Sequence, residues 1–282
     1  MKNLNIIDDS FKKKKHSASC MLSVQAAFTG LSYLVYDFQA SKCLALRHYD
    51  FGDNLSENQF YEKFDDIFSN DELINNQYEQ VRFMTITKRG MLVPNQFYDV
   101  NHLKNFFVFN FFLSDSESLY VNKFNTGNIF CLFPLNSYFS STLINRYDKV
   151  SFYHHSTPFI QYCLKKVINR HQVFINVFQN FFDILVVSPD GIELYNHYNY
   201  QTADDFIYYI LNTYKVFGLS PEKSDITIYG EIFTDTPHYQ KLKKFIHKIE
   251  FSKIDKRIVE NKITKRIPDH TFLNLINMGF CE

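Results

Sequence analysis

Apolar positions in the early part of the chain alternate with the two-residue period of β-strands. The alternation predicts strands over residues 22–28, 31–37 and 42–49, with Thr29-Gly30 as the first turn. A helical period follows over 57–68, where Ser56 is the expected N-cap and four large apolar side chains share one side: Phe60, Phe64, Ile67 and Phe68. The chain is therefore predicted to open with a three-stranded meander and a helix.

The middle of the chain alternates short strands with helices. Strands are predicted over 81–87, 119–123, 129–133 and 149–153, and helices over 99–109, 137–145 and 159–168. Pro134 is expected to end its strand, and Thr157-Pro158 supplies an N-cap with proline at the first helical position. The apolar run 106–113 is too short to span a bilayer, and we expect it in the core.

The opening pattern returns after His171. Strands are predicted over 173–178, 182–187, 192–198 and 226–229, and helices over 203–217 and 237–249, the former capped by Thr202. In each meander the third strand ends in an aromatic-polar-aromatic triplet, Tyr49-Asp50-Phe51 and Tyr198-Asn199-Tyr200. We interpret this as an internal duplication. The alternative is that two amphipathic meanders look alike without common descent.

The duplication predicts three parts of the chain. Residues 1–19 form a flexible lead-in, residues 20–170 form a first half with inserted strand-helix units, and residues 171–282 form a second half. The C-terminal tail within this second half is expected to dock onto the core, since it would be costly to leave its large apolar side chains in water: Leu273, Leu275, Ile276 and Phe280.

Composition narrows the class of protein. The charges of thirty basic and thirty acidic residues cancel, so the chain lacks the positive electrostatic field expected of a dedicated nucleic-acid binder. A hydrophobic content of 45% excludes a disordered protein. Five scattered cysteines without a C-x-x-C pair favour reduced thiols in the cytoplasm, and no apolar stretch approaches the roughly 20 residues needed for a transmembrane helix.

The repeated meander, helix, strand and helix resemble the ribonuclease H-like halves of the actin, sugar kinase and Hsp70 superfamily, above all the bacterial relatives that assemble type IV pili. The resemblance implies an α/β fold with two ribonuclease H-like halves, each a mixed sheet with a three-stranded meander and flanking helices. Three further features resemble a Bacteroidetes family known as domain of unknown function 3822: Leu92-Val93-Pro94, Asp204-Asp205-Phe206 and Gly279-Phe280-Cys281-Glu282.

The superfamily resemblance also implies a nucleotide site. It places Thr29, Gly30 and Ser32 at a first phosphate turn, Gln179 and Asn180 at a second, and Gly230 at the strand end near adenosine. The acidic metal ligands of the superfamily are replaced, because Phe28 precedes the first turn and Asn180 occupies the second. We therefore expect no cofactor, no metal site and no catalytic residue, with ATP and magnesium as the alternative.

Other candidate chemistry has a simpler structural interpretation. His154 and His155 would point to opposite faces of a strand and could not share one metal. Asp204 and Asp205 fall in the first turn of a helix, where negative charge is stabilised by the helix dipole, and Asp65-Asp66 is read as a solvated face. The common motifs for phosphate cradling, acyl transfer and zinc hydrolysis are absent from the sequence.

Basic residues gather in the segment 241–266. Lys241, Lys244 and Lys248 would form a stripe along the helix predicted over 237–249. The stripe indicates either a solvated outer face or a site for an acidic partner or nucleic acid, whose affinity would fall steeply with salt.

Three hypotheses about function remain. The first is a non-enzymatic cytoplasmic scaffold or interaction protein with a degenerate actin-like fold, whose cleft or sheet edge binds another protein. The second is a nucleotide-binding ATPase-like protein with unorthodox phosphate ligands. The third is an RNA-associated accessory factor that uses the basic segment.

Overall fold

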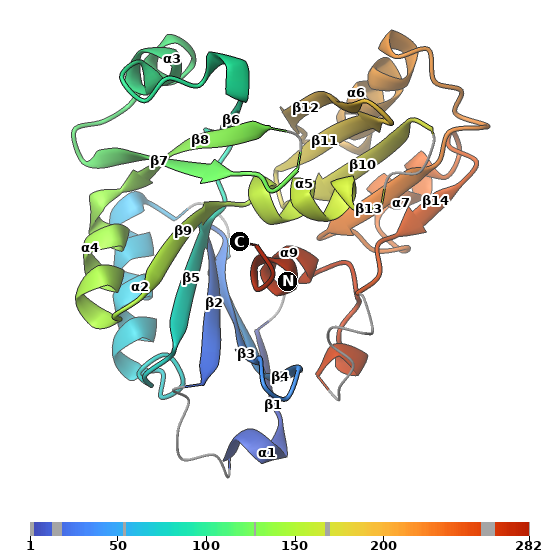
Figure 1. The fold of residues 1–282 in the computed structure, drawn as a ribbon. Coiled ribbons are helices and arrows are strands. Elements are labelled where there is room, and N and C mark those ends of the chain that lie inside the picture. The colour runs from blue at the N-terminus through green and yellow to red at the C-terminus, as the bar shows by residue number, and fades with distance from the viewer. Residues whose placement is uncertain are drawn as a thin grey trace. The chain divides into compact units, whose positions relative to one another are not determined.

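A computed structural model describes residues 3–12, 19–52, 55–126, 128–166, 170–254 and 263–281 of the 282-residue chain. The chain divides into two compact units. The first takes in the described residues of Met1–Pro158, Asp255–Ile267 and Asn274–Glu282, and the second those of Phe159–Ile254 and Pro268–Leu273. Each unit is built around a mixed sheet (Figure 1).

The first unit contains a six-stranded sheet. Its strands follow the order β1 (Leu4–Ile7), β4 (Lys42–Asp50), β3 (Gly30–Asp37), β2 (Cys20–Ala27), β5 (Gln80–Thr85) and β9 (Val150–His154). Neighbours from β1 to β2 are antiparallel, whereas β2, β5 and β9 are parallel. Alternation therefore sends Leu22, Val24 and Phe83 to one face of the sheet and Met21, Ser32 and Arg82 to the other.

Helices cover both faces of this sheet. Figure 1 shows α2 (Glu57–Asn70) and α4 (Ser137–Arg146) on one face and α9 (Leu273–Met278) on the other. The predicted cap Ser56 is confirmed, because it forms a capping box with Gln59 at the start of α2. Two short elements complete the main body of this unit: α1 (Asp9–Lys12) and the 3-10 turn η2 (Thr264–Arg266).

Between β5 and β9 the first unit carries an inserted three-stranded sheet. Its order is β6 (Met91–Pro94), β8 (Ile129–Asn136) and β7 (Glu117–Lys123), and it carries the 3-10 turn η1 (Asn95–Phe97) and α3 (Leu103–Asn110). Strand β8 continues through Pro134, which corrects the predicted strand end. Proline fits there because β6 pairs with β8 only as far as Leu132, so one side of β8 is an edge at Pro134.

The second unit contains a five-stranded sheet. Its order is β12 (Gly191–Asn199), β11 (Phe181–Ser188), β10 (Gln172–Val177), β13 (Ile226–Gly230) and β14 (Ile249–Phe251). Core side chains of α6 (Ala203–Val216) and of α7 (Pro237–Leu242) with the turn after it pack on one face, and α5 (Ser156–Leu164) contacts the other through Phe159 and Tyr229. The predicted cap Thr202 is confirmed by its capping box with Asp205.

The two sheets repeat one topology. In each, an antiparallel meander (β2-β3-β4 or β10-β11-β12) is extended from its first strand by two parallel strands (β5-β9 or β13-β14). A helix with a capping box follows each meander and packs on the same relative face. The fold is mixed α/β, and the shared topology agrees with the predicted duplication.

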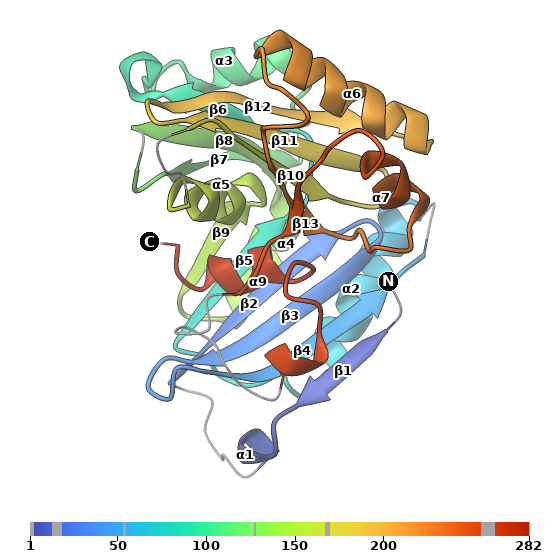
Figure 2. The same ribbon diagram turned by 90° about the vertical axis from the view of Figure 1, so that its right-hand side faces the viewer.

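Both ends of the chain differ from the expected division. Residues 4–7 form β1, which pairs antiparallel with β4 (Figure 2), so this part of the lead-in is ordered. The C-terminal tail forms α9 and belongs to the first unit, where the Arg82 guanidinium donates to the carbonyl of Met278 at 2.6 Å and to that of Cys281. Short segments whose partners lie far away in sequence leave little local signal, which explains both corrections.

The helix predicted over 237–249 is also shorter than expected. Helix α7 ends at Leu242, and a turn then buries Ile246 before the chain enters β14. Ile249 pairs with Ile226 of β13, which requires an extended backbone at that point. Pairing between distant strands therefore overrides a helical periodicity that continues past Leu242.

A buried carboxylate joins three elements of the first unit. Asp71, at the C-cap of α2, is 4% exposed and accepts hydrogen bonds from the hydroxyls of Tyr33 on β3 (2.7 Å) and Tyr49 on β4 (2.5 Å). The Arg47 guanidinium lies 2.8 Å from the same oxygen. Burial alone would raise the pKa of Asp71, but these donors outweigh burial and hold the pKa below its usual value.

We expect Asp71→Asn to lower the free energy of unfolding by about 3 kcal/mol at neutral pH, because the buried Arg47 contact loses its counter-charge. Because the pKa of Asp71 is lowered in the folded state, its carboxylate stabilises that state above about pH 3.9, the ordinary pKa of an aspartate. This contribution disappears as the pH falls through the pKa of the folded state. Urea unfolding followed by circular dichroism should therefore show a weaker acid dependence in the variant. Asp66→Asn, at an exposed position of α2, is the control. Equal unfolding midpoints for wild type and Asp71→Asn would contradict this role.

Candidate functional site

The first hairpin is closed by contacts within the chain. Gly30 starts β3 where the carbonyl oxygen of Tyr49 would lie 2.6 Å from an added Cβ, so close backbone approach explains the glycine. Thr29 accepts a main-chain hydrogen bond from Phe51 at 3.0 Å. The buried Ser32 hydroxyl lies 2.9 Å from Nδ1 of His48 on β4. All three predicted residues therefore have a structural role.

The second hairpin has the same construction with larger side chains. Gln179 and Asn180 are exposed at its tip, between Phe178 and Phe181, whose rings stack with centroids 4.6 Å apart. Asn180 accepts a main-chain hydrogen bond from Tyr200 at 3.2 Å, as Thr29 does from Phe51. The two predicted phosphate turns are thus equivalent positions of the repeated topology.

In each sheet, three polar residues lie side by side on neighbouring strands close to the hairpin, and we call each set a polar row. In the first unit Ser32 pairs in register with Gln25 and His48, and in the second Asp183 pairs with Asn176 and His197. Asp183 is fully buried, and the Asn176 amide approaches its carboxylate at 3.5 Å. The prediction included Ser32 but missed the row. The signal in the sequence was the histidine that precedes both aromatic triplets.

Gly230 lies beside the second hairpin, because it pairs in register with Val177 of β10. It has φ +86°, and the Val177 carbonyl oxygen would lie 2.0 Å from an added Cβ. The structure thus brings Gly230 near Gln179 and Asn180. The positive φ and the close Val177 backbone are sufficient to require a glycine at this position.

The predicted basic stripe is not present as a helix face. Lys241 lies on α7, but Lys244 and Lys248 follow the end of that helix, and residues 255–262 of the basic segment lie outside the described residues. Lys241 pairs with Asp204, and Lys248 lies 2.6 Å from Asp225 and 2.9 Å from Glu250. These neighbouring carboxylates offset the positive charges of Lys241 and Lys248.

The histidines and acidic pairs take structural positions. His154 is buried at the end of β9, with Nδ1 2.7 Å from the Ser156 hydroxyl and Nε2 2.8 Å from the Thr87 carbonyl oxygen. Asp205 takes part in the capping box at the start of α6. His238 packs against the ring of Tyr200, and burial lowers the pKa of His238. Within the described residues no group of three or more His, Cys, Asp or Glu side chains could hold a metal ion.

The largest departure from expectation is the apolar run 106–113. Phe107 is buried as expected, but Phe106, Phe109 and Phe112 are 40%, 89% and 79% exposed. We call the exposed large apolar residues of the segment 97–112 the α3 surface: Phe97, Val100, Phe106, Val108, Phe109 and Phe112. The sequence shows that this segment is apolar, but it does not show which of its side chains pack on the inserted sheet, as Phe107 does.

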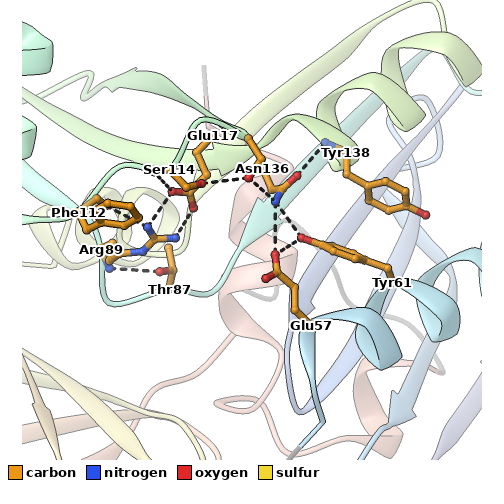
Figure 3. Close-up of polar contacts among 10 residues, drawn as sticks. Glu57, Tyr61, Thr87, Arg89, Phe112, Ser114, Glu117, Asn136 and Tyr138 are labelled. Atoms are coloured by element: carbon orange, nitrogen blue, oxygen red, sulfur yellow. Dashed lines mark hydrogen bonds and ion pairs between the residues drawn. The ribbon is translucent and has the colours of Figure 1, made fainter.

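A polar network fixes the chain that follows α3 (Figure 3). Arg89 forms a bidentate ion pair with Glu117, one contact being 2.9 Å, and donates to the Phe112 carbonyl at 3.2 Å. The main-chain amide of Ser114 donates to Glu117 at 3.1 Å. Burial alone would raise the pKa of Glu117, but these donors reverse the shift and keep the carboxylate ionised.

The same network reaches α2. The Asn136 amide, at the end of β8, donates to the Tyr61 hydroxyl at 2.8 Å and to Glu57 at 3.4 Å, both on α2 (Figure 3). Ser116 lies 3.5 Å from the same amide. The inserted sheet and the base of the α3 surface are therefore anchored to a helix of the main core.

Two solved structures share this fold. A protein from Bacteroides thetaiotaomicron VPI-5482 with an actin-like ATPase fold and unknown function is 20% identical, with 98% of this chain and 100% of that chain covered and a TM-score of 0.79. A structure of the PilM-PilN type IV pilus biogenesis complex is 9% identical, with coverage of 95% and 98% and a TM-score of 0.56. These likenesses confirm the predicted actin-like architecture.

Comparison with curated proteins gives no match. In the part of the chain that the structure describes, no helix is long and apolar enough to cross a membrane. A family model described as "Protein of unknown function (DUF3822)" matches residues 8–249, which is most of the chain. The family predicted from the sequence is thus confirmed, and the chain belongs to the DUF3822 family.

Proposed function

We propose that the chain is a non-enzymatic scaffold or interaction protein of the cytoplasm, and that a partner protein docks on the α3 surface. The exposed phenylalanines of this surface carry the proposal. Four of them, Phe97, Phe106, Phe109 and Phe112, are 40–89% exposed. At about 150–250 Å² for each phenylalanine, they leave on the order of 500 Å² of aromatic surface in water, an area typical of a binding site.

Rigid support makes this surface suitable for docking. The Arg89–Glu117 pair and the Arg89 contact to the Phe112 carbonyl fix the chain beyond α3. A surface that is already ordered loses less conformational entropy when a partner binds. The fold relative in the PilM-PilN complex supports the proposal further, since it is a protein of similar architecture described as part of a complex with a second protein.

Nucleotide binding is the second candidate, and the matched polar rows favour it. Ser32 and His48 in one unit correspond to Asp183 and His197 in the other, directly behind turns where the actin-like resemblance implies phosphate contacts. ATP and magnesium are the ligands to test. The weaker candidate is an RNA-associated role, because Lys241 and Lys248 already face carboxylates.

Thermal unfolding with and without millimolar magnesium ATP separates the first two candidates. A ligand present at about 100 times its Kd would stabilise the folded protein by about 2.7 kcal/mol and raise Tm by several degrees. We expect no rise. A reproducible rise that disappears in Asn180→Ala, but persists in the exposed α6 control Asn212→Ala, would replace the scaffold proposal by the nucleotide site. Gly30 is unsuitable as a probe because an added Cβ would collide with Tyr49.

Affinity capture from cells that express the chain tests the docking surface. We expect the wild-type chain, used as isotopically labelled bait, to retain a defined partner that mass spectrometry identifies. The variant Phe109→Ser/Phe112→Ser should lose at least about nine-tenths of the captured partner, as expected for hot-spot residues. The matched control Tyr208→Ser/Val216→Ser removes two apolar side chains of α6 that are 65% and 69% exposed. Equal capture by both variants, or no capture by wild type, would contradict docking at α3.

A further inference from the structure

We propose that the partner at the α3 surface is a second copy of the same chain, packed about a two-fold axis. The inference rests on the proposed docking function and names its partner. In such an arrangement the α3 helices of two copies would lie antiparallel, so that each copy contributes the same residues.

The composition of α3 calls for burial on more than one side. Phe107 is fully buried against the inserted sheet, and Leu103 and the C-cap residue Phe111 are half-buried beside it. Phe106, Val108 and Phe109 are exposed on the remaining sides. Phe106 and Phe109 are three residues apart and therefore share one of these sides, which no residue of the same helix covers. Phe107 is the buried residue of this helix.

The exposed area is sufficient for a specific contact between two copies. Two copies of the four phenylalanines supply about 1,000 Å², the lower limit for a specific interface, before Val100 and Val108 are counted. Aromatic side chains from both copies can meet edge to face, which strengthens the contact beyond the area that it buries. An interface at this lower limit is expected to give a weak dimer that forms as the protein concentration rises.

Charge also favours a second copy. The chain carries no net charge, so two copies do not repel each other at long range. Asp99 is paired with His102 at 2.7 Å, and Lys104 is the one charged residue within α3 itself. Lys104 lies about 140° around the helix from Phe109, so the side of α3 that carries Phe106 and Phe109 can be buried without burying a charge.

Sedimentation velocity of the purified chain from about 1 to about 100 µM tests the inference directly. We expect wild type and Tyr208→Ser/Val216→Ser to pass from monomer to dimer, and Phe109→Ser/Phe112→Ser to bind at least about tenfold more weakly. Circular dichroism and Tm verify that each variant is folded.

Two results would overturn the second copy as partner. The first is that the wild-type protein stays monomeric over this concentration range. The second is that the wild-type protein dimerises and the two phenylalanine substitutions leave the dimerisation unchanged. A monomer that still captures a different protein through Phe109 and Phe112 would refute self-association alone. If the wild-type chain neither self-associates nor captures a partner, the proposed function is refuted as well.

Discussion

Helix α2 is held by polar side chains at both ends, and the position of the inserted sheet depends on it. At its C-terminal end Asp71 accepts from Tyr33 and Tyr49 and faces Arg47, which joins the helix to β3 and β4. Near its N-terminal end Glu57 and Tyr61 meet the Asn136 amide from β8. The helix thereby transmits the rigidity of the main sheet to the insertion, which carries the α3 surface.

The two units repeat one topology but differ in what lies between their parallel strands. In the second unit α7 alone connects β13 and β14, whereas the corresponding stretch of the first unit contains a three-stranded sheet, α3 and α4. The hairpins that the actin-like resemblance links to phosphate are closed by contacts of the chain itself, such as Ser32 with His48. The exposed phenylalanines of the α3 surface belong to the insertion, and for this reason we connect function with α3.

Local signals predicted much of the fold. Ser56 and Thr202 were recognised as N-caps because a cap depends on residues three positions away, and alternating apolar positions revealed both meanders. Predictions were wrong where a distant partner decides the structure. Strand β1 depends on β4, the early end of α7 on the pairing of β14 with β13, and the strand through Pro134 on where β6 ends.

The candidate site was harder to predict than the fold. The run 106–113 was assigned to the core because periodicity reports that residues are apolar, whereas exposure depends on how many elements surround them. Residues taken from the superfamily resemblance lie at equivalent positions of the two hairpins, yet Gly30, like Gly230 at the end of β13, is explained by backbone approach. Buried Asp183 escaped attention since strand alternation does not show which polar residue points inward from a fully covered strand.

Hydrogen–deuterium exchange of the purified chain at low and high protein concentration tests most directly whether the α3 surface is occupied. The account predicts that peptides covering 97–112 become more protected as concentration rises, while peptides of α6 exchange at an unchanged rate. Unchanged exchange over 97–112, or protection that rises equally in both segments, would contradict a specific role for the exposed phenylalanines of α3.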